Sequence, residues 1–321
     1  MKQWHAACAL VIAGAVSCGG EPPMPAVAPA GPPPAPSSPP AALASSAPVA
    51  GGEAARTAPA DAASSKTALG ELSFPITGSA ECQRLFRDGV LALHSFLYDQ
   101  AHASFAAALT ADPACAMASW GDAMTFDHPI WHERDLPKAR AALAKITHDE
   151  ALTPKERAYV AAARELFAKE DGKQAHAAWL AAAAKMHAEY TDDDEVALQH
   201  ALALLSVYGY DLAHVREQME AGNIALEVLR RHPNHPGAAH YTIHAFDSPE
   251  HAILALEAAR TYARIAPAGG HAQHMPSHTF VHLGMWREVV PSNERAYAAS
   301  VAWEKSRGRS AKTDPRSESE A

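Results

Sequence analysis

Apolar residues recur along most of the chain with the spacing of amphipathic α-helices. From Phe74 to about Trp303, leucine, alanine and aromatic residues return at helical intervals, and no segment alternates apolar and polar residues clearly enough to predict a β-strand. The abundant alanines favour helices that pack closely together. The pattern predicts an all-α fold for residues 71–303, with little or no sheet.

Local start signals place several of these helices. Thr153-Pro-Lys-Glu156 is a capping box with proline in the first helical position, which predicts a helix that begins at Pro154. The run of aspartates at 192–194 predicts a capped, solvated helix start. Other helices are expected near residues 135–147, 174–189, 194–208 and 217–231.

The first residues of the chain have the pattern of a targeting segment. Residues 1–17 combine Lys2 with an apolar stretch too short to span a bilayer, which predicts a signal peptide. The string Ala15-Val-Ser-Cys18 resembles the lipobox of bacterial lipoproteins, which implies a lipid on Cys18. An ordinary secretory signal with an incidental cysteine is the alternative. Gly19 after the cysteine implies, by resemblance, that the anchor lies in the outer membrane.

Residues 18–70 are rich in proline, alanine, glycine and serine, and no aromatic residue occurs between Trp4 and Phe74. Such a segment cannot bury enough apolar surface to offset the entropy lost on ordering. We therefore expect a disordered linker that tethers the helical part to the membrane. The polar residues 304–321 are expected to form a disordered tail.

Small residues and prolines recur at the spacing of a known helical repeat. With Cys82 as the first position of a unit, Gly89 falls at position eight, and the remaining signature residues follow as Ala101, Phe105, Ala108 and Pro113. The chain thus resembles tetratricopeptide-repeat (TPR) proteins over roughly residues 80–303. It resembles in particular a bacterial subgroup with the strings Cys115-Ala-Met-Ala-Ser-Trp-Gly, His235-Pro-Gly-Ala-Ala-His-Tyr and His274-Met-Pro-Ser-His278. The resemblance implies an α-solenoid of antiparallel helix pairs with a concave binding face.

Histidines between residues 236 and 284 form the clearest candidate site. His240 and His244 are four residues apart, as are His274 and His278, so each pair lies on one face of a helix. His274 follows His240, and His278 follows His244, by the same 34 residues, which is the period of the TPR unit. The resemblance places these four on the concave face, with a second tier formed by His94, His128 and His282.

Two interpretations of these histidines stay open. Neutral imidazole is a common ligand of zinc, copper, nickel and iron, and paired histidines on two facing helices can supply three or four ligands. Alternatively, the histidines form hydrogen bonds with one another, with carboxylates or with a bound peptide. Pro276 affects the second pair, because the helix either begins near this residue or is kinked there.

Other candidate residues support structural roles. Asp247 and Glu250 are expected near a helix N-terminus, where acidic side chains suit the helix dipole, rather than as ligands. Cys82 and Cys115 either form a disulfide in an oxidising periplasm or remain packed thiols.

Composition narrows the function classes. The net charge of −9 argues against a nucleic-acid partner, which requires a basic surface. The chain has no glycine-rich phosphate loop, G-x-S-x-G elbow or Cys-x-x-Cys pair, so no catalytic residue is identified. We expect an envelope lipoprotein that binds a protein or peptide in a histidine-lined groove, with a transition metal such as zinc, copper or iron as a further expectation. A metal-dependent enzyme that uses the same histidines is the alternative.

Overall fold

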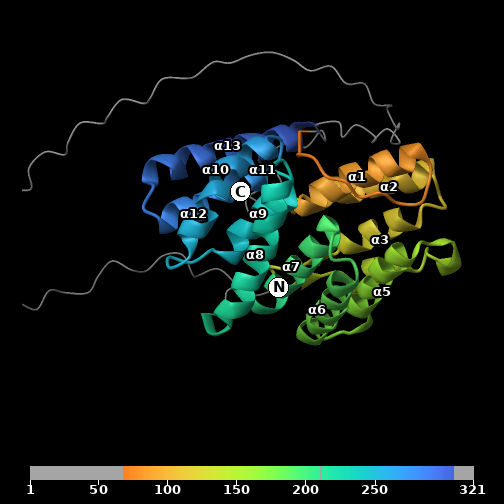
Figure 1. Ribbon diagram of the computed structural model, residues 1–321. Helices are drawn as coiled ribbons and strands as arrows, with labels where there is room; N and C mark the ends of the chain where they lie inside the picture. Colours follow the sequence, from red (N-terminus) through yellow and green to blue (C-terminus); the bar gives the residue numbers. More distant parts are fainter. Residues whose placement is uncertain (1–67, 210–211, 307–321) are drawn as a thin grey trace, which may run out of the picture. The chain divides into compact units, whose positions relative to one another are not determined.

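The computed structural model describes residues 68–209 and 212–306, which all belong to the second of the chain's two units, Pro59–Ala321. These residues are mostly helical, which confirms the predicted all-α class (Figure 1). The predicted signal peptide, Cys18, most of the predicted linker and the residues from 307 onward lie outside the described residues. The expectations about them stay predictions.

The first half of the described chain is a series of helices in which each packs against the next. In chain order these helices are α1 (Ala80–His94), α2 (Tyr98–Ala111), α3 (Ala116–Met124), α4 (Leu136–Leu143), α5 (Pro154–Ala168) and α6 (Gly172–Glu189), with a 3₁₀ turn, η1 (Asp149–Ala151), before α5. Two short strands, β1 (Asp127–His128) and β2 (Glu133–Arg134), pair antiparallel between α3 and α4. This hairpin agrees with the expectation of little sheet.

The second half continues the series from α6 onward. Its elements are α7 (Asp194–Tyr208), η2 (Leu212–His214), α8 (Val215–Arg231), α9 (Pro236–Ala245), α10 (Ala252–Ile265), α11 (Gly270–His274), α12 (Pro276–His282) and α13 (Trp286–Ser306). Helix α1 also contacts α9, although the two are far apart in the sequence. This contact brings the end of α1 to the histidines of α9.

Local sequence signals predicted several helix boundaries correctly. Thr153 accepts from the backbone N–H of Glu156, and the Glu156 side chain accepts from that of Thr153, so the predicted capping box starts α5. Asp193 caps α7. Helix α11 ends at His274 and α12 begins at Pro276, so of the two alternatives for this proline the helix start is correct.

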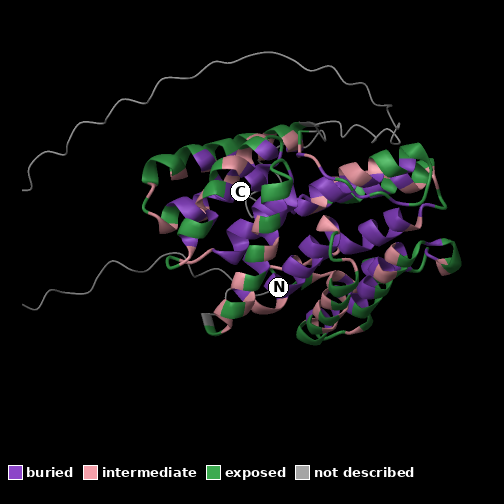
Figure 2. Ribbon diagram, in the orientation of Figure 1, coloured by how far each residue is buried: buried purple, intermediate pink, exposed green. Residues whose placement is uncertain are grey.

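Small residues allow α1, α2 and α3 to approach closely. The ring of Phe105 is fully buried, and a Cβ added to Gly89 or Gly121 would lie 2.5 or 2.4 Å from it. Ala101 and Ala108 are also fully buried. This close approach agrees with the packing expected from the abundant small residues, and the buried positions follow the facing sides of the helices (Figure 2).

The segment before α1 adds to the core and is held by polar contacts. Leu72, Phe74 and Ile76 are buried, and Thr77 donates to the Glu156 carboxylate through both its backbone N–H and its hydroxyl.

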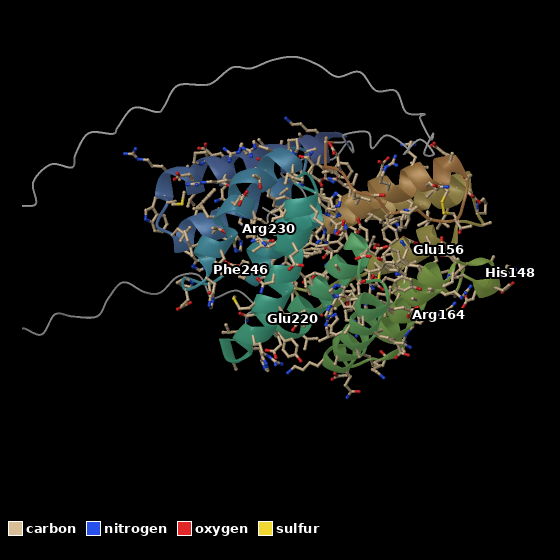
Figure 3. All side chains as sticks on the ribbon, viewed as in Figure 1. His148, Glu156, Arg164, Glu220, Arg230 and Phe246 are labelled. Carbon is tan, nitrogen blue, oxygen red and sulfur yellow. A yellow bond between two sulfur atoms is a disulfide. The ribbon has the colours of Figure 1, made fainter. Side chains whose placement is uncertain are left out.

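A disulfide joins α1 to the residue before α3. Cys82 and Cys115 are bonded, which resolves the alternative left open by the sequence (Figure 3). Within the described residues, none of the helices combines the length and the apolar character needed to cross a membrane.

Candidate metal centre

Helix α9 carries the first two predicted ligands. Pro236 starts the helix, and every residue of α9 is buried, including His240 at 0% and His244 at 4% exposure. The His240 Nδ1 atom lies 2.7 Å from the backbone carbonyl oxygen of His94. Because a carbonyl can only accept, Nδ1 carries the proton and Nε2 keeps its lone pair. Helix α9 therefore presents a ring nitrogen in the form that binds metals.

A third histidine, which was not among the predicted ligands, joins these two from α11. The Nε2 atoms of His271 and His240 are 3.0 Å apart and form a hydrogen bond, in which His271 donates because His240 Nε2 carries the lone pair. His240, His244 and His271 each offer a ring nitrogen within 4.8 Å of the other two. We call these three residues the histidine trio. His271 occupies position two of its unit when Gly270 is position one, and position two also faces inward in the resembled repeat, so the register contained a signal for it.

Burial favours the neutral form of the trio. Desolvation lowers the pKa of His240, His244 and His271 well below the usual histidine value, and the neighbouring histidines lower it further. Since a metal ion binds neutral imidazole, the three rings have the required charge at neutral pH. A metal ion at His271 Nε2 would require the proton of this ring to move to Nδ1.

The other two predicted ligands form a separate group that is partly buried. His274 Nδ1 lies 2.7 Å from Asn293 Oδ1, and His278 Nδ1 lies 2.8 Å from Asp247 Oδ2. The Nε2 atoms of His274 and His278 face each other at 3.1 Å. Because both Nδ1 atoms donate to oxygen, both Nε2 atoms carry lone pairs when the rings are neutral. Such a pair is stable when it shares a proton or another cation.

Asp247 corrects one prediction from the sequence. Helix α10 begins only at Ala252, and Asp247 instead accepts hydrogen bonds from His278 and from His282, whose Nε2 lies 3.0 Å away. Burial opposes its ionisation, but the two histidines outweigh this effect and lower the pKa of Asp247. His282, predicted as a second-tier ligand, thus belongs to the His274–His278 group.

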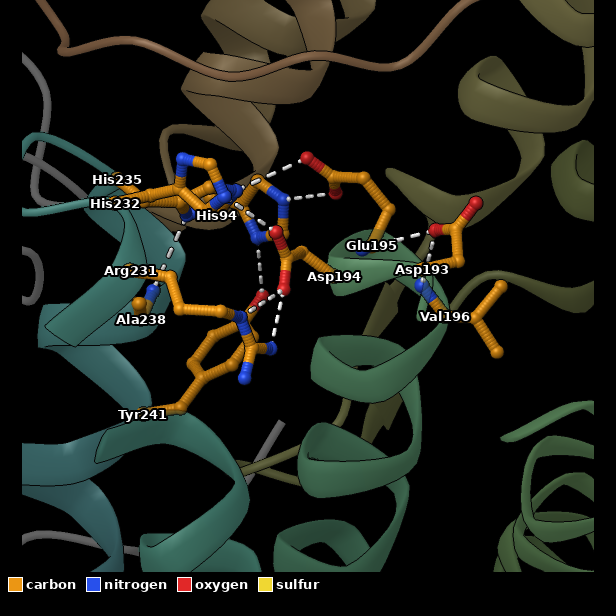
Figure 4. A network of polar contacts seen from close by, with 10 residues as sticks. All are labelled: His94, Asp193, Asp194, Glu195, Val196, Arg231, His232, His235, Ala238 and Tyr241. Carbon is orange, nitrogen blue, oxygen red and sulfur yellow. Dashed lines mark hydrogen bonds and ion pairs between the residues drawn. The ribbon is translucent and has the colours of Figure 1, made fainter. Parts of the chain in front are cut away.

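His94 lies in a third group, in which each ring nitrogen has a matching partner (Figure 4). His94 Nε2 donates to Glu195 at 2.8 Å and its Nδ1 accepts from Tyr241 at 2.9 Å, while His235 Nε2 donates to the other Glu195 oxygen at 3.0 Å. Burial raises the pKa of Glu195, but His94 and His235 outweigh it and lower the value to about 2. The nitrogen and oxygen atoms of His94, Glu195 and His235 are close enough together to hold an ion. Hydrogen bonds within the protein, however, already occupy these atoms.

The structure thus divides the predicted histidines instead of bringing them to one point. His240 and His244 meet His271, and the ring of His271 lies 6.2 Å from that of His274, so the first two groups adjoin. His128 is outside both groups, where it stacks on Tyr98 with ring centroids 3.8 Å apart.

Comparisons with known proteins give no family for this chain. No model of a known protein family matches it, and no curated protein matches it either.

Proposed function

We propose that this chain is a helical-repeat metalloprotein whose histidine trio binds one transition-metal ion, such as zinc, copper or iron. The convergence of three buried, neutral imidazoles from α9 and α11 carries the proposal. Zinc–nitrogen bonds are ~2.0–2.1 Å long, so nitrogens 3.0 Å apart subtend roughly 94° at such an ion. This angle lies between the octahedral and the tetrahedral values.

The surroundings of His240 support a preorganised site. Metal-bound histidines usually donate their second ring nitrogen to an oxygen that fixes the ring, and the His94 carbonyl has this role for His240. The His94 side chain is itself held by Glu195 and Tyr241. Phe96 packs edge-on against the His240 ring at 4.4 Å. These contacts hold the ring in place before a metal arrives.

Burial favours a metal ion over a peptide as the ligand of these histidines. The trio residues are at most 7% exposed, so a peptide on the surface would not reach them. A protein partner elsewhere on the helical surface and the lipid anchor remain predictions, and the metal proposal uses neither.

A metal-dependent enzyme is a second candidate function. Catalytic zinc sites keep three protein ligands and one open position, whereas structural sites have four protein ligands. The trio supplies three ligands, and a cavity lined in part by His271 gives small molecules access to one of them.

Calorimetric titration of the metal-free protein with zinc, without a histidine tag, tests the proposal. We expect one ion per chain and a loss of at least ~100-fold in affinity for His240→Gln and for His271→Gln, which each remove a direct ligand. His187→Gln is the matched control, because His187 is a partly buried histidine bonded to His200, away from the trio.

The variant His278→Gln distinguishes the trio from the ligand set predicted from the sequence, which included His278. If the trio alone binds the ion, the affinity of His278→Gln for zinc should stay within a few-fold of that of the wild type. A protein that binds neither zinc, copper nor iron, or a His187→Gln variant as impaired as His271→Gln, would contradict the proposal.

A further inference from the structure

A cavity of ≈ 370 Å³ lies beside the histidine trio. Its lining comes from segments distant in the sequence: the turn between α1 and α2 with the start of α2, the β1–β2 hairpin, the start of α11 and the end of α13. His271 belongs both to this lining and to the trio. The cavity therefore leads to the proposed metal site.

Aromatic rings form much of this lining. Phe96 and Tyr98 stack with centroids 5.6 Å apart, and Trp131 meets Phe96 edge-on at 5.5 Å. Trp303 contributes a further ring from α13. Trp131 is 45% exposed although it is a large apolar side chain. An indole left open at a cavity offers a binding face to a ligand.

The charged groups of the lining have one sign. Asp99, Glu133 and Glu304 contribute carboxylates, and none of the described residues that line the cavity is lysine or arginine. The basic side chains of the lining are histidines: His128, whose Nδ1 lies 3.4 Å from a carboxylate oxygen of Glu133, and the buried His271. Among the described lining residues, three carboxylates without a lysine or arginine favour a cationic ligand over an anionic one.

We propose that the cavity binds a small organic cation, an alkylammonium or guanidinium compound. The faces of tryptophan and tyrosine attract such cations through the ring quadrupole, and desolvation strengthens the attraction. A purely apolar ligand would not use the carboxylates, and a bare metal ion would not use the aromatic rings. The inference rests on the lining alone and not on metal binding.

The lining also places the cationic group within the cavity. The exposed ring of Trp131 and the carboxylate of Glu133 come from the same β1–β2 hairpin, so we expect the positive charge to lie toward these two residues.

Binding is measured by tryptophan fluorescence and calorimetry on the metal-free protein, with choline, butylammonium and guanidinium as probes. The control ligand is 3,3-dimethylbutan-1-ol, which has the shape of choline without its charge. We expect saturable binding of at least one cation, and an affinity of the neutral alcohol at least ~10-fold below that of choline if choline is the cation bound.

Variants locate the binding site. Trp131→Ala should weaken cation binding at least ~10-fold, and Glu133→Gln about threefold. Trp286→Ala is the matched control, because Trp286 is a 64% exposed tryptophan at the start of α13 that does not line the cavity. Circular dichroism melting confirms that each variant is folded.

Three results would overturn the inference: no saturable binding of any of the three cations, equal binding of choline and the neutral alcohol, or an equal effect of Trp286→Ala and Trp131→Ala. Because the protein is metal-free in this assay, a failure here leaves the metal proposal standing. A failure to bind zinc likewise leaves this inference standing.

Discussion

The buried trio should make the metal-free protein sensitive to mild acid. Histidine in an unfolded chain has a pKa of about 6.5, whereas burial holds the pKa of His240, His244 and His271 well below that value in the folded protein. Below about pH 6.5 the unfolded chain therefore binds more protons than the folded chain. Stability falls as the pH falls through this range.

The size of the effect follows from the unfolded pKa. Each histidine that stays neutral in the folded state lowers the free energy of unfolding at pH 5.5 by about 1.4 kcal/mol relative to pH 7.5. The trio therefore lowers it by about 4 kcal/mol. His200 acts in the same direction, because burial and the nearby His187 lower its pKa to about 4. Glu195 does not add to this loss of stability. Its pKa in the folded protein is about 2, so the stabilisation that it provides is fully present above about pH 4.5 and is lost only in stronger acid.

Urea unfolding in a chelating buffer at pH 7.5 and pH 5.5 measures this loss. The control is the triple variant with glutamine at residues 240, 244 and 271, which should lose about 4 kcal/mol less between the two pH values than the wild type. Equal stability of the wild type at both pH values would refute the reasoning. An equal loss in the triple variant would show that other groups are responsible.

Three further predictions concern the fold and the anchor. Gly89→Ala places a methyl group 2.5 Å from a buried ring and should lower the free energy of unfolding by on the order of 1–3 kcal/mol, whereas Gly172→Ala, with no neighbour nearer than 3.9 Å, should not. Replacing Cys82 and Cys115 by serine should cost about 3–4 kcal/mol, because their disulfide closes a loop between residues 33 apart; an unchanged urea midpoint would contradict this. Cys18→Ala should move the protein from the membrane fraction to the soluble fraction, and a wild type that is already soluble would show that Cys18 carries no lipid.

Local signals in the sequence were sufficient for much of the fold. The capping box at Thr153–Glu156, the caps before α7 and the small residues around Phe105 act through neighbours in the sequence or through one packing contact. Such signals can be recognised without the tertiary structure. They do not predict the contact between α1 and α9. That contact depends on the packing angles between all the helices that lie between these two in the chain.

The candidate site was predicted only in part for the same reason. The 34-residue spacing pairs His240 with His274. In the structure the helix is divided at Pro276, whose nitrogen has no proton to donate. His271 of the short helix α11 therefore meets His240 instead. Glu195 is part of an acidic helix start in the sequence, and its burial between His94 and His235 follows from the α1–α9 contact.

Anomalous diffraction at the absorption edge of the bound metal tests the central claim most directly. Crystals of the protein loaded with zinc should show one strong anomalous peak at ~2.0–2.1 Å from a ring nitrogen of each of His240, His244 and His271. The His94 carbonyl should still accept from His240 Nδ1 in that structure. A zinc-loaded crystal with no peak at the trio, or with its peak only between His274 and His278, would contradict the account.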